Sequence, residues 1–532
     1  MKNLIKKTCT ACALTVSAVM LAGGVIPALA EQIQQGRSSS QTPYVLPSEP
    51  EVETKSILTV GDSVDGYRMV GIPDGLGAFD NGDRTFTLLM NHELGNTLGT
   101  VRAHGAKGAF VSKWIINKKD LSVLSGGDLM KEVYLWDTDT QASKITPSTF
   151  AFNRFCSGDL PKVSAYYNPT TGRGTKERIY MHGEEGGSTG YQLGTVVTGP
   201  NAGKSYILGK FNLTTNGSGL TGVGAWENAL ANPYPQNKTV VIGNNDGGTG
   251  IMNNSVAVYV GTKQKTGSEV DKAGLTNGTL KFVNVAGNAA EIADATTRAT
   301  NITNGTRFTL DSSASTTFSR PEDGAWNPRN PNQFYFVTTD RLDTVSDGVG
   351  MQIGQTRLWR LTFDDIKNPD HGGTIDLLID GRTVNGQKVN MFDNITVNEK
   401  TGQIGLLEDV GNAAHNGKVW LYDPSTDVLV QVAKHDPARF GDIGVSETSP
   451  FNQDEETSGV IDVSSILGAG SYLLVDQAHY KIDDTNPNGF LTPSELVEGG
   501  QLMMIRIPVA PTGEGEQDDR DAEQRRAPGQ NR

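Results

Sequence analysis

Short β-type runs recur along almost the whole chain and constrain its fold more than any other feature. Examples are "TFTLLMNHE" at residues 85–93, "SVAVYVGTK" at 255–263 and "KVWLYDP" at 418–424, which are rich in β-branched, aromatic and leucine residues. The 63 glycines are spread throughout instead of gathering in a linker, and amphipathic helices are scarce. A long all-β chain without domain breaks predicts a β-propeller, because a ring of four-stranded blades leaves only short, protected sheet edges.

The chain divides into one large folded region and three flanking segments. Residues 1–30 have a basic start, an apolar run and a small-x-small site, which predict a secretory signal peptide. Residues 31–54 are polar and rich in Pro and Ser and predict a flexible lead-in, while 511–532 predict a disordered tail. Residues 55–510 form the expected catalytic propeller with short helical insertions. No strict sequence period accompanies the runs, so the pattern itself does not specify the blade number.

The signal peptide predicts a periplasmic or extracellular protein, and no other segment is apolar for long enough to span a bilayer. Loss of the leader, with Lys2, Lys6 and Lys7, would move the formal net charge from −14 to about −17. No basic cluster offsets this charge, which argues against nucleic acid or an anionic membrane as partner. We expect the mature chain to be a monomer.

Several β-type runs end in acids or amides. These endings are Asn91–Glu93, Glu184–Glu185, Asn244–Asp246, Glu408–Asp409 and Asp476–Gln477. Any one of them alone is ordinary turn chemistry. Five together indicate carboxylates that converge on one mouth of the ring, where they can bind hard cations.

Cys156 is the third cysteine of the chain, and the other two, Cys9 and Cys12, lie in the leader. After export it would have no partner for an internal disulfide. Its neighbours in "NRFCSGDL" are mostly polar, which is not typical of a core strand. Three interpretations remain: a packing residue, a metal ligand beside the many carboxylates, or a nucleophile that needs a histidine base such as His182 or His92.

A series of ordered landmarks resembles the PhoX-type alkaline phosphatase family. They are "NHE" (91–93), "NRFCSG" (153–158), "GEEG" (183–186), "GAWENAL" (224–230), "NNDGGTG" (244–250), "FSRPEDGAWNP" (318–328) and "DNITVNEKTGQIGLLED" (393–409). Together they cover about residues 60–507, and "RPEDGAWNP" is the most specific. The resemblance implies a six-bladed propeller whose axial pocket holds iron and calcium and hydrolyses phosphomonoesters.

The resemblance also implies roles for individual residues, because family members bind iron through a cysteine and glutamates and contact phosphate through an arginine. By matching motifs, Cys156, Glu227 and Glu322 would bind iron and Arg320 would hold phosphate. The calcium candidates are Glu184, Glu185, Asp246, Asp393 and Glu408. His92 and Glu93 are further catalytic candidates. A different interpretation makes Arg320 and Glu322 an ordinary surface ion pair.

Two departures from the family pattern concern export and substrate. Lys6-Lys7 stands where such enzymes usually carry twin arginines, which indicates a Sec-type signal. The segment "VSAYYNPTTGRGTKER" at 163–178 replaces an expected Trp-rich stretch, which leaves the substrate's shape open.

A separate motif lies near the C-terminus. "DTNPNGFLTPSE" at 484–495 fits a calcium loop of EF-hand type, with Asp484, Asn486, Asn488 and Glu495 as oxygen donors. We expect this loop to have a structural role.

The leading interpretation is a secreted, metal-dependent phosphomonoesterase that acts on small-molecule phosphate esters with calcium and iron. Multivalent cations stabilise the charge that develops on phosphoryl oxygens, and the planar fork of arginine matches phosphate. Two alternatives are a calcium-dependent propeller lactonase or esterase, and a non-catalytic, calcium-stabilised binding propeller.

Overall fold

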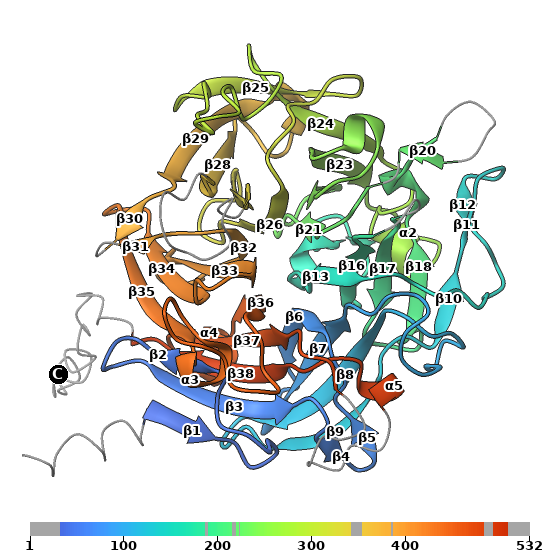
Figure 1. Cartoon of the computed structure of the whole chain (residues 1–532). Coiled ribbons are helices and arrows are strands. Elements are labelled where there is room, and N and C mark those ends of the chain that lie inside the picture. The colour runs from blue at the N-terminus through green and yellow to red at the C-terminus, as the bar shows by residue number, and fades with distance from the viewer. Residues whose placement is uncertain are drawn as a thin grey trace, which may run out of the picture.

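Antiparallel sheets radiate around a central axis in the computed structural model (Figure 1). The structure describes residues 32–186, 190–214, 220–222, 224–341, 354–384, 387–482 and 493–508. Within these residues the main strands form six blades, so the prediction of an all-β propeller is confirmed. The expected leader and tail lie outside the described residues.

The first three blades follow one another along the chain. Blade one is β6 (Pro73–Asp80), β7 (Thr85–His92), β8 (Phe110–Asn117) and β9 (Val123–Asp128). Blade two is β13 (Phe155–Asp159), β16 (Ile179–Glu184), β17 (Gln192–Val196) and β18 (Lys204–Ile207), with β10 (Glu132–Tyr134) at its edge. Blade three is β21 (Leu230–Ala231), β22 (Lys238–Asn244), β23 (Val256–Thr262) and β24 (Thr279–Val285).

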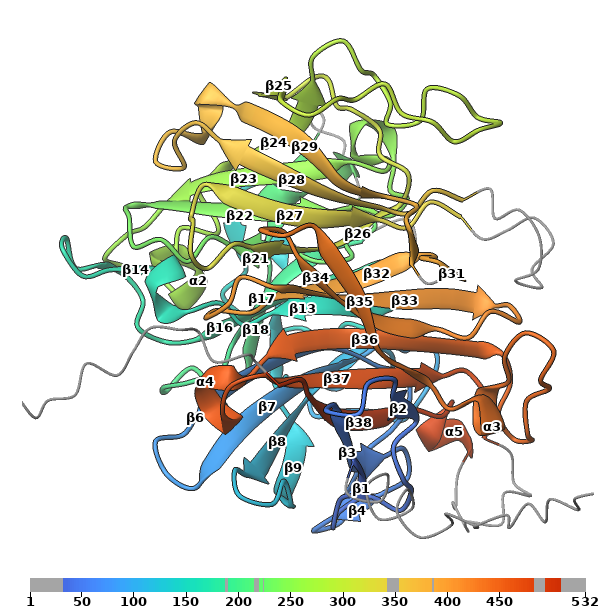
Figure 2. The same cartoon turned by 90° about the vertical axis from the view of Figure 1, so that its left-hand side faces the viewer.

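The last three blades are linked to their neighbours by shared strands. Blade four is β26 (Pro321–Trp326), β27 (Gln333–Thr338), β28 (Arg357–Phe363) and β29 (Gly373–Asp380), and β25 (Thr306–Asp311) connects it to blade three. Blade five is β32 (Phe392–Val397), β33 (Ile404–Asn412), β34 (Lys418–Asp423) and β35 (Val428–His435). Blade six is β36 (Asp454–Asp462), β37 (Ser471–Ala478), β38 (Gln501–Arg506) and β3 (Glu53–Thr59). Seen from the side, blades four, five and six lie one above another (Figure 2).

The N-terminal segment closes the ring. β3 pairs antiparallel with the C-terminal β38, β1 (Ile33–Gln35) pairs with β3, and β2 (Val45–Pro47) pairs with β35. Residues 32–54, which we expected to be a flexible lead-in, therefore contribute strands to blades five and six. Main-chain hydrogen bonds to sheet edges hold this segment together with the buried ring of Tyr44, which packs against Phe440 and Phe451.

The helical insertions are short, as expected. They are α2 (Glu269–Lys272), α3 (Pro437–Phe440), α4 (Ser464–Leu467) and α5 (Pro493–Leu496), with 3-10 turns η1 (Val163–Ala165), η2 (Gly209–Phe211), η3 (Gly250–Met252) and η4 (Pro369–His371). Small hairpins are β4 (Ser63–Val64) with β5 (Tyr67–Arg68), β11 (Trp136–Asp137) with β12 (Ala142–Ser143), β14 (Tyr167–Asn168) with β15 (Arg173–Gly174), β19 (Leu213–Thr214) with β20 (Leu220–Gly222), and β30 (Thr383–Val384) with β31 (Gln387–Lys388). Among the described residues, no helix combines the length and apolar character needed to cross a membrane.

The apolar core lies between adjacent blades and leaves the axis to other residues. Trp114, Trp226, Trp359 and Trp420 are fully buried within these layers. Sheets that pack face to face bury one another's apolar faces, so each blade is stabilised by its neighbours. The innermost strands are consequently free to present polar side chains to the axis.

The innermost strands of four blades share one irregularity. The pairing register shifts between Pro73 and Leu76, between Phe155 and Gly158, between Pro321 and Gly324, and between Phe392 and Ile395. Such bulges re-aim side chains and occur often beside functional sites. The first residue inside the bulge is Asp74 in blade one, Cys156 in blade two, Glu322 in blade four and Asp393 in blade five. A structural repeat is therefore present although the sequence lacks a strict period.

Candidate metal centre

The inner edge of every blade contributes one acid or thiol to a common cluster. The members are Asp74, Cys156, Glu227, Glu322, Asp393 and Glu456, from blades one to six in that order. Glu227 lies three residues before β21, and its N–H donates to the Asn244 carbonyl at 3.2 Å. The structure thus brings together four residues that the sequence singled out and adds Asp74 and Glu456.

A second set of acids comes from the ends of the next strands. Glu93, Glu185 and Asp409 donate their N–H groups to the carbonyls of Ile72, Arg154 and Met391 at 2.9, 2.9 and 3.0 Å, respectively. Each accepting residue lies two positions before the acid or thiol that its blade contributes to the cluster. In these three blades the second acid therefore occupies the same position relative to the first. Asp246 follows β22 in blade three. We call Glu93, Glu185, Asp246 and Asp409 the axial row.

Seven of these residues form three overlapping groups of potential metal ligands. The groups are Asp74, Glu93 and Cys156; Cys156, Glu185 and Glu227; and Glu227, Asp246 and Glu322. Within each group the ligand atoms lie within 4.8 Å of one another. Opposite oxygen ligands of a cation with bonds of about 2.4 Å are separated by about this distance. Cys156 and Glu227 each belong to two groups, so the three groups are contiguous.

Burial and mutual repulsion raise the pKa values of the clustered acids. Burial, followed by the charges of Glu93 and Glu456, raises the pKa of Asp74 well above its usual value. The pKa of Glu185 rises to about 8 and that of Glu456 to about 7, again chiefly through burial. Burial also raises the pKa of the Cys156 thiol. Multivalent cations would supply the missing positive charge and deprotonate these groups, so the donor set fits metal ions.

Two arginines border the cluster and neutralise part of its charge. Arg320 donates from Nε to Asp246 at 2.8 Å and from Nη2 to Glu322 at 2.7 Å. Arg154 contacts Glu93 at 2.6 Å through Nε and Glu185 at 2.5 Å through Nη2. The predicted pair of Arg320 and Glu322 is therefore part of the axial cluster and not an isolated surface ion pair.

A single amide links blades one and six within the cluster. Nε2 of Gln477 lies 3.1 Å from Asp74, 3.1 Å from Glu93 and 3.4 Å from Glu456. Beside it, His479 lies 2.8 Å from Glu498 and 3.9 Å from Glu456. These contacts show how closely the first and last blades approach at the axis.

His92 does not reach the cluster, which does not fit the expectation that it acts in catalysis. Its ring stacks on Phe110 with centroids 4.3 Å apart, and its nitrogens lie 3.2 Å from the Gly71 carbonyl and 2.9 Å from Ser112. Burial lowers its pKa to about 3. His92 is a neutral packing residue of blade one.

Glu184 and Glu408 also point away from the axis, contrary to the calcium-ligand expectation. Glu184 accepts the N–H groups of Asn153 at 2.8 Å and Tyr191 at 3.1 Å. Glu408 lies 3.0 Å from His415 Nε2 and accepts the Trp420 indole N–H at 3.0 Å. Although burial acts to raise it, the pKa of Glu408 is lowered by His415, so this carboxylate is charged inside blade five.

The strand period explains these three cases. His92, Glu184 and Glu408 each pair with the residue directly before a bulge, namely Pro73, Phe155 and Phe392. Successive side chains of a strand point to opposite faces, so the next residue, Glu93, Glu185 or Asp409, faces the axis. We call His92, Glu184 and Glu408 the blade row. Adjacent residues thus have different roles.

The motifs assign no individual role to Asp74, Arg154, Asp409 or Glu456, although Asp409 is one of the strand-end acids expected at the mouth of the ring. "PDG" at 73–75 is similar to "PEDG" at 321–324 and was a usable signal for Asp74. Asp409 stands beside Glu408, and choosing between them requires the strand's orientation. Of the expected EF-hand loop, Asp484, Asn486 and Asn488 lie outside the described residues, and Glu495 lies 3.9 Å from Arg68. The calcium loop therefore stays a prediction.

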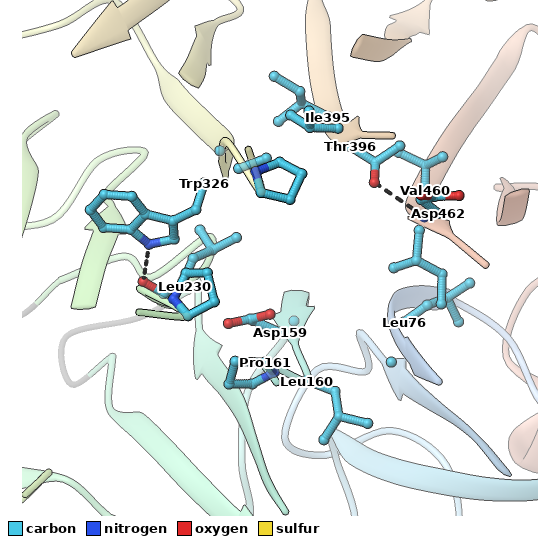
Figure 3. Close-up of a pocket in the computed structure, with 18 of the residues that line it drawn as sticks. Leu76, Asp159, Leu160, Pro161, Leu230, Trp326, Ile395, Thr396, Val460 and Asp462 are labelled. Atoms are coloured by element: carbon cyan, nitrogen blue, oxygen red, sulfur yellow. Dashed lines mark hydrogen bonds between the residues drawn. The ribbon is translucent and has the colours of Figure 1, made fainter. Parts of the chain in front are cut away.

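Hydrogen bonds between inner strands separate the acid cluster from a cavity further along the axis. Asn228 donates to Asp323 at 2.6 Å, Asn394 to Ser157 at 3.0 Å, and Ser458 to Asp74 at 2.7 Å. Beyond this layer lies a cavity of about 250 Å³ whose labelled lining residues include Leu76, Asp159, Leu160, Pro161, Leu230, Trp326, Ile395, Thr396, Val460 and Asp462 (Figure 3). Its walls combine apolar side chains with charged ones such as Asp159, Asp323 and Asp462. Among the described residues, none of the groups of potential metal ligands lies there.

Comparison with solved structures supports the fold. The chain is similar to Pseudomonas fluorescens PhoX in complex with vanadate, a transition-state analogue, with a TM-score of 0.57 and 12% identity over 86% of this chain and 95% of that one. The β-propeller domain of Cps50 (Swd1) from Myceliophteria thermophila and a putative 6-phosphogluconolactonase from Bacteroides uniformis each have a TM-score of 0.28 and 9% identity. They cover 82% and 77% of this chain and 96% and 94% of their own. Scores this low carry no functional argument.

No protein-family model and no curated protein matches the chain. At 12% identity, the similarity to PhoX is evidence for the propeller fold alone. The functional argument therefore rests on the chemistry of the axial cluster.

Proposed function

We propose that the chain is a metal-dependent phosphomonoesterase, similar to PhoX, that hydrolyses small phosphate esters at the axial cluster. The observation that carries this proposal is the contiguous set of ligand groups sharing Cys156 and Glu227 and bordered by Arg320. The chain shares its fold with a PhoX structure that holds vanadate, so this fold can carry a site of the proposed kind. With the leader expected at residues 1–30, the enzyme would act in the periplasm or outside the cell.

The donor types suggest which metal each position suits. Cys156 and Glu322, each of which shares a ligand group with Glu227, are with Glu227 the proposed iron ligands, because a thiolate is a softer ligand than calcium prefers. Glu185, Asp246 and Asp393 offer only carboxylate oxygens, which suit calcium. Glu93 belongs to a ligand group with Asp74 and Cys156, so we propose it as a ligand and not as a proton-transfer group. Bound cations would stabilise the negative charge of the transferring phosphoryl group.

The chain's own residues would orient the ester. Arg320 is partly exposed, and its guanidinium is held by Asp246 and Glu322, which fixes the plane of its donors before a substrate arrives. A planar fork held in this way can bind two phosphoryl oxygens at once. Glu322 would thus have two functions: it orients Arg320 and it contributes an oxygen to the metal centre.

The direct test is hydrolysis of p-nitrophenyl phosphate by the purified mature protein, with metal analysis of the same preparation. Exhaustive treatment with EGTA should abolish hydrolysis, and added calcium should restore it, because the repelling carboxylates need cations. Full activity after chelation would contradict the proposal. Hydrolysis of a lactone or carboxylic ester without any hydrolysis of phosphate esters would favour the alternative esterase.

A further inference from the structure

Arg154 has the same relation to blade two that Arg320 has to blade four. Each arginine stands directly before the inner strand, with φ of +54° and +56°, and two residues before the acid or thiol in the bulge. The carbonyls of Arg154 and Arg320 accept N–H groups, both at 2.9 Å, from Glu185 and Thr339, which directly follow β16 and β27. β13 and β26, which these arginines precede, both border the axis (Figure 1).

The left-handed backbone conformation does not by itself require an arginine at these two positions. Met391 occupies the same position in blade five with φ of +41°, and its side chain is buried. A left-handed residue therefore precedes the bulged strand in blades two, four and five, whereas the partly exposed guanidinium occurs in blades two and four only among these three. The side chains of Arg154 and Arg320 are 49% and 36% exposed, so both are open to a solute.

The two guanidinium groups bind carboxylates at different ends of the ligand set. Arg154 contacts Glu93 and Glu185, which belong to the first and second ligand groups. Arg320 contacts Asp246 and Glu322, both of the third group. Because they border different groups, the two arginines are suited to two separate anionic groups of one molecule.

We propose that Arg154 is a second substrate-contacting residue and that the centre prefers phosphate esters that carry a further anionic group, such as a carboxylate or a second phosphoryl. The proposal rests on the proposed function, in which Arg320 holds the phosphoryl group that is hydrolysed. Arg154 then binds the further anion through the face of its guanidinium fork that is open to solvent.

Binding of a matched pair of non-hydrolysable ligands tests this proposal without relying on turnover. Phosphonoacetate is methylphosphonate with an added carboxylate, and calorimetry on the calcium-loaded protein measures the affinity of each. We expect phosphonoacetate to bind about tenfold to 100-fold more tightly, which is typical of one charge-assisted contact. In Arg154→Gln this preference should fall at least tenfold, and Arg154→Lys should retain part of it because the charge remains.

A matched control separates substrate contact from general electrostatics. Arg307 on β25 is 50% exposed and forms a bidentate pair with Asp364, far along the sheet from the inner strands. Arg307→Gln should leave the preference for phosphonoacetate at its wild-type value. Calcium and iron contents of all variants are measured in parallel.

Kinetics provide the second readout. For 3-phosphoglycerate and glycerol 3-phosphate, which differ by a carboxylate, the ratio of kcat/KM values should exceed one in the wild type and fall toward one in Arg154→Gln. An equal fall for both esters together with loss of metal would mean that Arg154 only holds Glu93 and Glu185, and would overturn the proposal.

The outcomes distinguish this inference from the proposed function. A wild type that binds phosphonoacetate no more tightly than methylphosphonate, yet hydrolyses p-nitrophenyl phosphate, would overturn the role of Arg154 and leave the phosphatase standing. A binding preference that is lost in Arg154→Gln, in a protein without any phosphate-ester hydrolysis, would support Arg154 as an anion contact and overturn the catalytic proposal.

Discussion

The axial row and the blade row consist of neighbouring residues that have opposite functions. Glu185 contacts Arg154 and lies in a ligand group with Cys156 and Glu227, while Glu184 accepts two main-chain N–H groups. Asp409 acts electrostatically on Arg320 and on the acids around the axis, while Glu408 pairs with His415. An acid next to a functional acid is therefore not a second ligand but a structural element behind it.

The comparison shows how the fold tolerates so much negative charge at one place. Each axial acid is repelled by its neighbours and depends on arginines or cations. Each blade acid has permanent partners within its own blade, so it supports the strand that carries the axial acid. Substitutions at the axis should therefore lower activity and metal content, whereas substitutions in the blade row should lower stability.

Glu227→Gln should have the largest effect on activity because Glu227 belongs to two ligand groups. An amide oxygen is a neutral and weaker ligand, so we expect kcat/KM to fall by at least about 100-fold together with the metal content. Stability after chelation should not fall, since the substitution removes a repelling charge. Chemical denaturation with EGTA present measures this, and an unstable but fully active variant would place Glu227 in the blade structure.

Glu408→Gln should have the largest effect on stability. It removes the charge that faces His415 and the nearby Lys418 ammonium group and that accepts the Lys418 main-chain N–H inside blade five. Loss of one partner of a buried ion pair lowers the free energy of unfolding by about 3–5 kcal/mol. The neighbouring Asp409→Asn is the matched control and should lower metal content with a much smaller loss of stability. Equal losses in both variants would remove the distinction between the rows.

Cys156→Ser should lower activity and iron content by about tenfold, because a hydroxyl is a poor replacement for a thiolate on iron. If ferric iron binds there, the wild type should have a visible thiolate absorption band that the variant lacks. Thermal unfolding should change little. A colourless wild type, or a Ser variant that is unstable yet fully active per folded molecule, would identify Cys156 as a packing residue.

Substitution of Glu184 should have a smaller effect on stability, and this effect should depend on pH. Burial raises its pKa from 4.5 to about 8, so its contribution to stability is complete below about pH 4.5 and is lost as the pH rises through about 8. The associated slope is at most about 1.4 kcal/mol per pH unit. Glu184→Gln should flatten the decrease between pH 5 and pH 9 in denaturant unfolding. An unchanged pH profile in Glu184→Gln would show that Glu184 does not titrate in this range.

Much of the site was visible in local sequence patterns. Cys156, Glu227, Glu322 and Asp393 were singled out by motifs, and the structure places all four on the axis. The convergence of strand-end acids was also expected. The sequence does not show which residue of each adjacent pair, Glu184 or Glu185 and Glu408 or Asp409, faces the axis. The alternation of side chains along a strand requires only that neighbours face opposite sides of the sheet.

Local sequence patterns also do not indicate which residues the first and last blades contribute to the site. Asp74 accepts a hydrogen bond from Ser458, which is 384 residues away, and Gln477 connects Asp74 to Glu456. Contacts over such distances follow from closure of the ring by β3 and β38. The segment around β1 and β2 is polar in composition and predicts flexibility, but β1 pairs with β3 and β2 with β35, and Tyr44 packs against Phe440 and Phe451.

The sequence by itself determined the all-β class, the surplus of acids at strand ends, and the residues able to bind metal or phosphate, because strand propensity and donor chemistry are properties of local segments. Only the tertiary structure decided which of two adjacent acids faces the axis, that Arg154 stands in blade two as Arg320 does in blade four, and that six distant segments meet at one centre. Those features depend on bulge position, strand pairing and ring closure, which arise from contacts between residues far apart in the chain.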